Sequence, residues 1–249
     1  MFNDTIPVKK SVFGRFGAYV QQDDALFAWF TTREALRFSA RLKLKIPDEE
    51  QDALCEKIIY DLGLSMVSTS QIGSVQKKVL SGGERKRCAI GVELVSEPSV
   101  LLLDDPTAGL DSFKAFSIVM LLNKMARTKG KTILSTINQP SSESFFYFDK
   151  LILMTDGHIV YQGDAKKSVE HFRLINRPIP RFANPADYFM KVLSVRYPKR
   201  PEDEANIADL ARHYRTLNEP SVKGELKMVK VPVLEDFDPD ANMMASTFV

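Results

Sequence analysis

The segment Val100–Leu103 and the three residues after it constrain the fold most. Four consecutive apolar residues are typical of a central strand in a parallel sheet, where both faces are buried. Asp104, Asp105 and Pro106 follow at once, so two carboxylates lie where this strand ends. In α/β proteins ligands bind at that carboxyl edge. The sequence therefore predicts an α/β fold with a mainly parallel sheet core and a ligand site beside these two acids.

The remaining pattern alternates helices and strands, as such a fold requires. Thr31 with Glu34, and Ser81 with Glu84, have the spacing of capping boxes at helix N-termini. Apolar residues at helical spacing follow each of them. We expect helices over residues 31–42, 47–62, 81–95 and 112–126, strands over 18–20, 100–103 and 132–136, and a hairpin that joins 151–154 to 158–161.

Composition excludes some classes of protein. Lys and Arg number 34 against 32 acids in 249 residues, which argues against a nucleic-acid binder. No apolar run approaches the roughly 18 residues needed to span a bilayer, so we expect the chain by itself to be soluble. Cys55 and Cys88 lie in apolar helical patterns and are expected to be buried thiols. His158, His171 and His213 share no metal-ligand spacing.

The string Leu80-Ser81-Gly82-Gly83-Glu84 is the second candidate for chemistry. Two adjacent glycines let backbone N–H groups approach a ligand closely, and Ser81 adds a hydroxyl. The helix that begins here directs its positive dipole end outward, an arrangement that binds phosphate. A plain glycine-rich turn with a helix cap is the alternative for this string taken alone. The apolar segment that begins sixteen residues after Glu84 and ends in Asp104 and Asp105 favours the phosphate site, because a strand-end carboxylate can hold Mg²⁺ on a nucleotide.

These motifs together resemble a known family. The strings LSGGERKR, LLLDDPTAGLDS and STINQPSS are similar, in order and spacing, to the signature, Walker B, D-loop and switch segments of ABC ATPases. Further strings, among them YVQQDD and NPADYF, resemble the White or ABCG subfamily. The resemblance implies a partial, N-terminally truncated ABC cassette over residues 1–195, with a helical signature subdomain at about 31–95. Residues 196–249 would be a largely disordered linker toward an absent membrane domain.

The resemblance also assigns roles to individual residues. Gln22 would be the glutamine that senses Mg²⁺ and the attacking water, and Asp104 the Mg²⁺ carboxylate. Asp111 would be the acid at the seam between two cassettes. The signature residues would clamp a nucleotide held by a second cassette in a homo- or heterodimer; these residues are Ser81, Gly82, Gly83 and Glu84. ATP and Mg²⁺ are the implied cofactors.

The sequence departs from the family pattern in three places. The 249 residues contain no G-x-x-x-x-G-K-[ST] phosphate loop. Asp105 stands where the family has a catalytic glutamate, and its side chain is one methylene shorter. Asn138 stands where the family has a histidine, and an amide cannot become cationic near neutral pH. We therefore expect the isolated chain to bind ATP weakly or not at all and to be inactive as an ATPase.

Three functions stay open at this point. The first is a subunit or fragment of an ABCG-type exporter, on the cytoplasmic side of a membrane, that couples ATP hydrolysis to export of a lipid-like or hydrophobic substrate. The second is a non-hydrolysing module that donates its signature to an intact partner, or an inactive fragment. The third is an ABC ATPase of translation or repair, which the ABCG-like strings count against.

Overall fold

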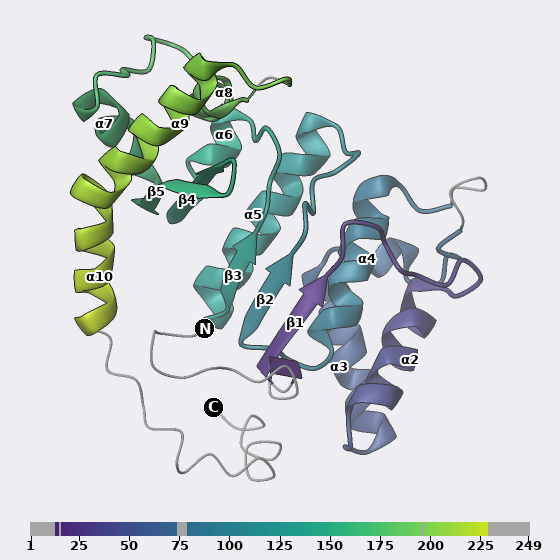
Figure 1. Cartoon of the computed structure of the whole chain (residues 1–249). Coiled ribbons are helices and arrows are strands. Elements are labelled where there is room, and N and C mark those ends of the chain that lie inside the picture. The colour runs from purple at the N-terminus through teal and green to yellow at the C-terminus, as the bar shows by residue number, and fades with distance from the viewer. Residues whose placement is uncertain (1–12, 15, 74–78, 196, 229–249) are drawn as a thin grey trace. The chain divides into compact units, whose positions relative to one another are not determined.

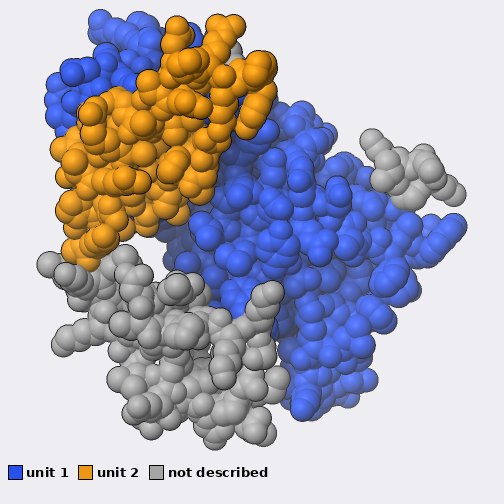
Figure 2. All heavy atoms as spheres, in the orientation of Figure 1, with its two compact units in different colours: residues 1–151, 164–195 blue, residues 152–163, 196–249 orange. Residues whose placement is uncertain are grey.

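Three short parallel strands form the sheet that holds the candidate site (Figure 1). In the computed structural model, β1 (Gly17–Val20), β2 (Val100–Leu103) and β3 (Thr132–Ser135) lie in the order β1-β2-β3. The structure describes residues 13–14, 16–73, 79–195 and 197–228. The chain divides into two compact units, residues 1–151 with 164–195 and residues 152–163 with 196–249 (Figure 2).

The central strand has no exposed residue, whereas each of its neighbours has at least one. Leu101 and Leu103 on β2 are buried, while Leu134 on the edge strand β3 is 56% exposed. The register pairs Val20 with Leu103 and Leu103 with Ser135, so all three strands end at the same level. The predicted α/β fold with a parallel sheet core is confirmed.

Three helices form a compact group between β1 and β2 in the sequence. They are α2 (Thr32–Lys43), α3 (Asp48–Asp61) and α4 (Gly82–Leu94), with the short 3₁₀ helix η1 (Ser65–Val67) after α3. Both predicted capping boxes are present. The three helices pack on one another through a shared apolar core, and α4 also packs on β1. Members of this core include Leu36, Cys55, Ile58, Ile59 and Ile90.

Helix α5 (Ser112–Lys129) connects β2 to β3 and ends at Gly130, whose φ of 61° is the left-handed conformation typical of a C-terminal glycine. The helices α6 (Ser142–Phe145), α7 (Ala165–Leu174) and α8 (Pro185–Leu193) gather around a second apolar cluster. Its rings come from Phe145, Phe172 and Phe189, with the last two centroids 4.6 Å apart.

The predicted hairpin is formed by β4 (Lys150–Thr155) and β5 (His158–Asp164). Asp156 and Gly157 both have positive φ, 46° and 79°, as a two-residue type I′ turn requires. In the second unit, α9 (Pro201–His213) leads through the π-helical turn η2 (Tyr214–Asn218) into α10 (Glu219–Met228). Among the described residues, no helix is both long and apolar enough to cross a membrane.

The tail differs from the expectation of disorder as far as it is described. Helix continues to Met228, whereas we expected residues 196–249 to be largely disordered. Pro220 has no N–H and would clash with a carbonyl one turn earlier in a regular helix. The π-turn widens the helix there, and the Glu219 N–H bonds the Tyr214 carbonyl instead. Residues 229–249 lie outside the described residues.

Leu36 gives a direct test of this packing, because it is fully buried between α2, α3 and α4. Leu36→Ala should lower the free energy of unfolding by about 3 kcal/mol, since truncation leaves a cavity in the core. Urea unfolding monitored by circular dichroism measures the change. Leu42→Ala is the matched control, on the same helix but 71% exposed, and should change stability little. Equal effects of the two substitutions would contradict the described core.

Candidate functional site

The ends of the three parallel strands bring the predicted site residues to one edge of the sheet. The Asp104 N–H donates to the Val20 carbonyl at 2.9 Å, and the Thr136 N–H donates to the Leu103 carbonyl at 3.1 Å. Gln22 lies two residues beyond β1, and Asn138 lies three residues beyond β3. Gln22, Asp104, Asp105 and Asn138 thus leave the sheet from the same edge, as the sequence predicted for the two acids.

Two hydroxyl groups hold the Asp104 carboxylate. The Tyr19 hydroxyl donates to Oδ2 at 3.1 Å, and the Thr136 hydroxyl donates to Oδ1 at 3.0 Å. Both donors are neutral, so the carboxylate keeps its negative charge available to a cation. The hydrogen bond to Asp104 raises the pKa of the Tyr19 phenol above 10, with smaller effects of burial and of the charge of Asp104.

Asp105 has a constrained backbone. Its φ is 34°, a left-handed conformation that Asp adopts more readily than most residues. Its N–H donates to the Thr136 hydroxyl oxygen at 2.9 Å, and its Oδ1 accepts a hydrogen bond from the Thr107 hydroxyl at 2.8 Å. Thr136 therefore contacts both acids through one oxygen atom. These hydrogen bonds hold Asp104 and Asp105 next to Thr136, the residue that follows β3.

The signature turn begins α4 and leaves its backbone close to the loop after β2. The Ser81 N–H and hydroxyl donate to Glu84 Oε2 at 2.8 and 2.7 Å, and these bonds lower the pKa of the Glu84 carboxyl. A Cβ added at Gly82 would lie 3.0 Å from Leu110 Cδ2, so a side chain there would crowd that loop. Ser81 and Gly82 are exposed, which leaves this helix N-terminus accessible to a ligand.

Asp111 and Asn138 occupy different surroundings from the strand-end acids. Asp111 caps α5: its Oδ1 accepts from the Lys114 N–H at 2.9 Å, and its Oδ2 lies 2.6 Å from the Lys114 ammonium. The hydrogen bonds with Lys114 lower the pKa of the Asp111 carboxyl. Asn138 is exposed and lines a small cavity together with Thr107 and Leu110. The cavity joins the loop after β2 to the loop after β3.

Gln22 is exposed, and its main chain is held by α4. The Lys86 ammonium donates to the Gln22 carbonyl at 2.9 Å and lies 2.6 Å from Asp24 Oδ1. Tyr19, Thr136 and Lys86 were not predicted as site residues. The first two could have been found only from the strand register, and Lys86 reads in sequence as one of three consecutive cationic residues.

Asp104 could hold Mg²⁺ as a single carboxylate ligand, with the other ligands supplied by a nucleotide and water. In the part of the chain that the structure describes, no three His, Cys, Asp or Glu side chains gather into a metal site. Mg²⁺ commonly takes one or two carboxylates together with phosphate and water oxygens. A carboxylate oriented by two neutral hydroxyls suits that mode, in which a nucleotide would supply further oxygens.

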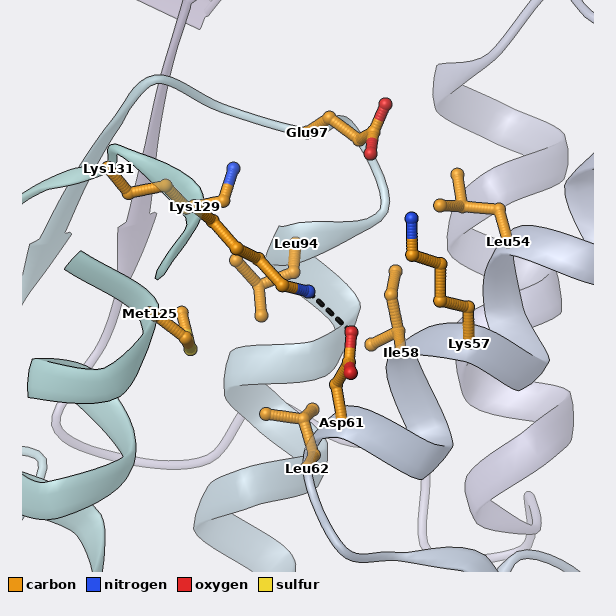
Figure 3. Close-up of a pocket in the computed structure, with 10 residues that line it drawn as sticks. All are labelled: Leu54, Lys57, Ile58, Asp61, Leu62, Leu94, Glu97, Met125, Lys129 and Lys131. Carbon is orange, nitrogen blue, oxygen red and sulfur yellow. Dashed lines mark hydrogen bonds and ion pairs between the residues drawn. The ribbon is translucent and has the colours of Figure 1, made fainter. Parts of the chain in front are cut away.

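A second pocket, away from this edge, does not suit a nucleotide. It lies between α3, the end of α4 and α5, and has an apolar floor with Lys57, Lys129 and Lys131 around it (Figure 3). The Lys129 ammonium pairs with Asp61, and the Lys131 ammonium donates to the Pro98 carbonyl at 2.7 Å. Its volume of about 40 Å³ is far below that of a typical ligand pocket, roughly 300–1,000 Å³.

Comparison with known proteins shows the family of the chain. A family profile described as "ABC transporter" matches residues 5–108, and one described as "ABC-2 type transporter" matches residues 138–230. The mouse broad substrate specificity ATP-binding cassette transporter ABCG2 is 41% identical over 178 residues, 71% of this chain and 27% of its own length. The chain belongs to the ABC transporter family, in its White or ABCG branch.

Other relatives support the same branch. ABC transporter G family member 13 of Arabidopsis thaliana is 41% identical over 71% of this chain and 26% of its own length. Protein white of Drosophila melanogaster is 39% identical over 79% of this chain and 29% of its own length. Across these and five further curated relatives, the chain spans between 14% and 35% of the relative's own length.

A solved structure shows the same type of fold. CbiO1 of Clostridium perfringens, part of the ABC transporter complex cbiONQ, is 29% identical, with a TM-score of 0.56. The similarity covers 65% of this chain and 62% of that chain. The α/β fold is therefore that of an ABC ATPase cassette, and membership of this family implies nucleotide binding.

The contact between Tyr19 and Asp104 can be tested by titration. Asp104→Asn removes the charge, so the Tyr19 pKa should fall toward 10, measured by NMR of ring-labelled tyrosine. A raised phenol pKa stabilises the folded chain below pH 10, and that contribution disappears as pH rises through the folded-state value. Asp23→Asn, which neutralises an exposed acid of the neighbouring loop, is the control and should leave the Tyr19 titration in place. An unchanged Tyr19 pKa in Asp104→Asn would show that the hydrogen bond is absent in solution.

Proposed function

We propose that this chain forms the nucleotide-facing part of an ABCG-type transporter cassette, in which ATP hydrolysis drives export of a lipid-like or hydrophobic substrate. The observation that carries the proposal is the placement of two separate contact regions on one unit. Asp104 and Asp105 lie at the edge of the sheet, and the signature turn at Ser81–Gly83 lies at the N-terminus of α4. The names of the relatives, which include a broad-specificity transporter, supply the class of function.

The strand-end residues would serve a nucleotide bound on this chain. Asp104 would hold Mg²⁺, which when bound would neutralise charge on the transferring phosphate. Gln22 would sense the metal and the water. Asp105 would orient the water, but its shorter side chain and its contact with the Thr107 hydroxyl hold the carboxylate near its own loop. Asn138 would donate a hydrogen bond without a charge, so turnover at this site would be slow.

The signature turn would serve a nucleotide bound on a second cassette. Ser81 and Gly82 are exposed at the start of α4, next to the buried Gly83, and backbone N–H groups and the helix dipole there favour phosphate. Glu84 keeps the turn in shape through its capping bonds. Asp111 would lie at the seam between the two cassettes. A membrane domain is the further partner that we propose, with the cassette on its cytoplasmic side.

A second candidate is a module that donates its signature without hydrolysing ATP itself. The observation that favours it is the contrast between the two regions. The signature turn is complete and capped, whereas the hydrolytic positions hold Asp105 and Asn138. Both candidates need Ser81–Gly83 to contact a nucleotide on another cassette, and they differ in whether this chain's own site turns over.

A complementation assay tests the step that both candidate functions share, which is the contact of Ser81–Gly83 with a nucleotide bound on another cassette. The partner is an intact ABCG cassette with its own phosphate loop, made inactive by replacing its signature serine with arginine. Adding this chain should restore ATP hydrolysis by the partner, because Ser81–Gly83 would complete the partner's site. Ser81→Arg in this chain should abolish the restored rate by ~10²-fold or more, since it removes contacts made to the transferring phosphate. Phosphate release measures the rate.

The control variant is Ser99→Arg, which changes an exposed serine at the amino end of β2. It should restore hydrolysis as well as the unsubstituted chain does. No restoration by the unsubstituted chain, or equal restoration by Ser81→Arg, would overturn the proposed function. Pairing the chain with a partner whose signature serine is intact, with and without Asp105→Asn in the chain, separates the two candidates: unchanged total turnover favours the donating module.

A further inference from the structure

Lys86 is a buried cation that makes no proposed contact with nucleotide. It lies in the second turn of α4, and its side chain is 3% exposed. Its ammonium donates to the Gln22 carbonyl at 2.9 Å and lies 2.6 Å from Asp24 Oδ1. One group on the signature helix thus contacts the loop that carries Gln22, more than 60 residues earlier in the chain.

The neighbouring residue strengthens this connection. The Arg85 guanidinium donates to the Gly73 carbonyl at 2.7 Å, and its Nε lies 3.7 Å from Asp24 Oδ2. The Asp24 carboxylate, 13% exposed, therefore faces two cations from the same helix. Separating the loop from α4 would leave buried charges without partners, which is strongly unfavourable. The loop and the helix should therefore move together.

We propose that Lys86 is a positioning residue that couples nucleotide contact at Ser81–Gly83 to the position of the Gln22 loop. The inference rests on the proposed function, in which the signature serves the partner's site and Gln22 serves the site on this chain. A regular helix transmits displacement of its N-terminus to its second turn, because its backbone hydrogen bonds keep it rigid. A displacement of the signature turn by the partner's nucleotide would then move Lys86 and, through it, the Gln22 loop beside this chain's own nucleotide site.

Amide hydrogen exchange without nucleotide tests whether Lys86 holds the loop. The Leu26 N–H donates to the Asp24 carbonyl at 2.8 Å and reports on that turn. Lys86→Met should speed exchange at Leu26 by about tenfold or more, because a hydrogen bond to a charged group and its ion pair are lost. Lys43→Met is the matched control. The Lys43 ammonium also contacts one carboxylate, of Glu93 at 2.8 Å, and one carbonyl, of Val92 at 3.4 Å, but it is more exposed.

Exchange at Leu26 in Lys43→Met should stay within twofold of the unsubstituted chain. Unchanged exchange in Lys86→Met would overturn the inference. If Lys86→Met does not fold, Asp24→Asn removes the same ion pair with a change of one atom and should give the same faster exchange. Unchanged exchange at Leu26 in Asp24→Asn would likewise overturn the inference.

A second comparison, with the inactive partner cassette and ATP, tests the coupling. In the unsubstituted chain, ATP should slow exchange both at residues 82–85 and at residues 21–30. In Lys86→Met the first response should remain and the second should disappear, which a merely structural role for Lys86 would not produce. Retention of both responses would overturn the coupling. Absence of both in the unsubstituted chain would refute the proposed function, and the ATP-free comparison would still decide whether Lys86 holds the loop.

Discussion

Parallel pairing of β2 with both neighbours is the constraint on which the described site depends. Val100–Leu103 is apolar and central, so its backbone groups can be satisfied only by strands on each side. The resulting register sets Val20, Leu103 and Ser135 at one level. The candidate residues that follow these strands therefore lie at the same edge of the sheet, independent of the conformation of the connecting segments.

Polar side chains refine this backbone arrangement. The hydroxyls of Tyr19 and Thr136 orient Asp104, and the Thr136 oxygen also receives the Asp105 N–H. On the other side, Lys86 connects the Gln22 loop to the helix that begins at the signature turn. The strand ends and the signature helix are therefore joined by specific contacts as well as by the apolar core. In our account one unit contacts two nucleotides. Asp104 and Asp105 contact the nucleotide bound on this chain, and the signature turn contacts the nucleotide bound on a second cassette.

The sequence was sufficient for the elements whose signals are local. Capping boxes at Thr31 and Ser81, the apolar run before Asp104 and the Asp156-Gly157 turn each depend on a few adjacent residues, and all are present. Contacts that depend on register could not be predicted, because nothing in the sequence sets Tyr19 beside Asp104.

The described part of the tail is helical, although we expected residues 196–249 to be largely disordered. The π-turn before Pro220 lets the helix continue through α10. The assigned roles of Gln22, Asp105, Asp111 and Asn138 remain proposals that rest on family resemblance and on position.

Disulfide cross-linking tests the central claim most directly, that the signature turn contacts a nucleotide site on another cassette. Cys55 and Cys88 are buried, and burial raises their pKa values to about 11 and about 12, so both are poorly reactive and give a low background. The measurement pairs Ser81→Cys in this chain with a partner cassette whose only cysteine lies in its phosphate loop. Our account predicts a cross-link that forms rapidly with ATP present, and none with Ser99→Cys. Equal cross-linking from both positions, or none from Ser81→Cys, would contradict it.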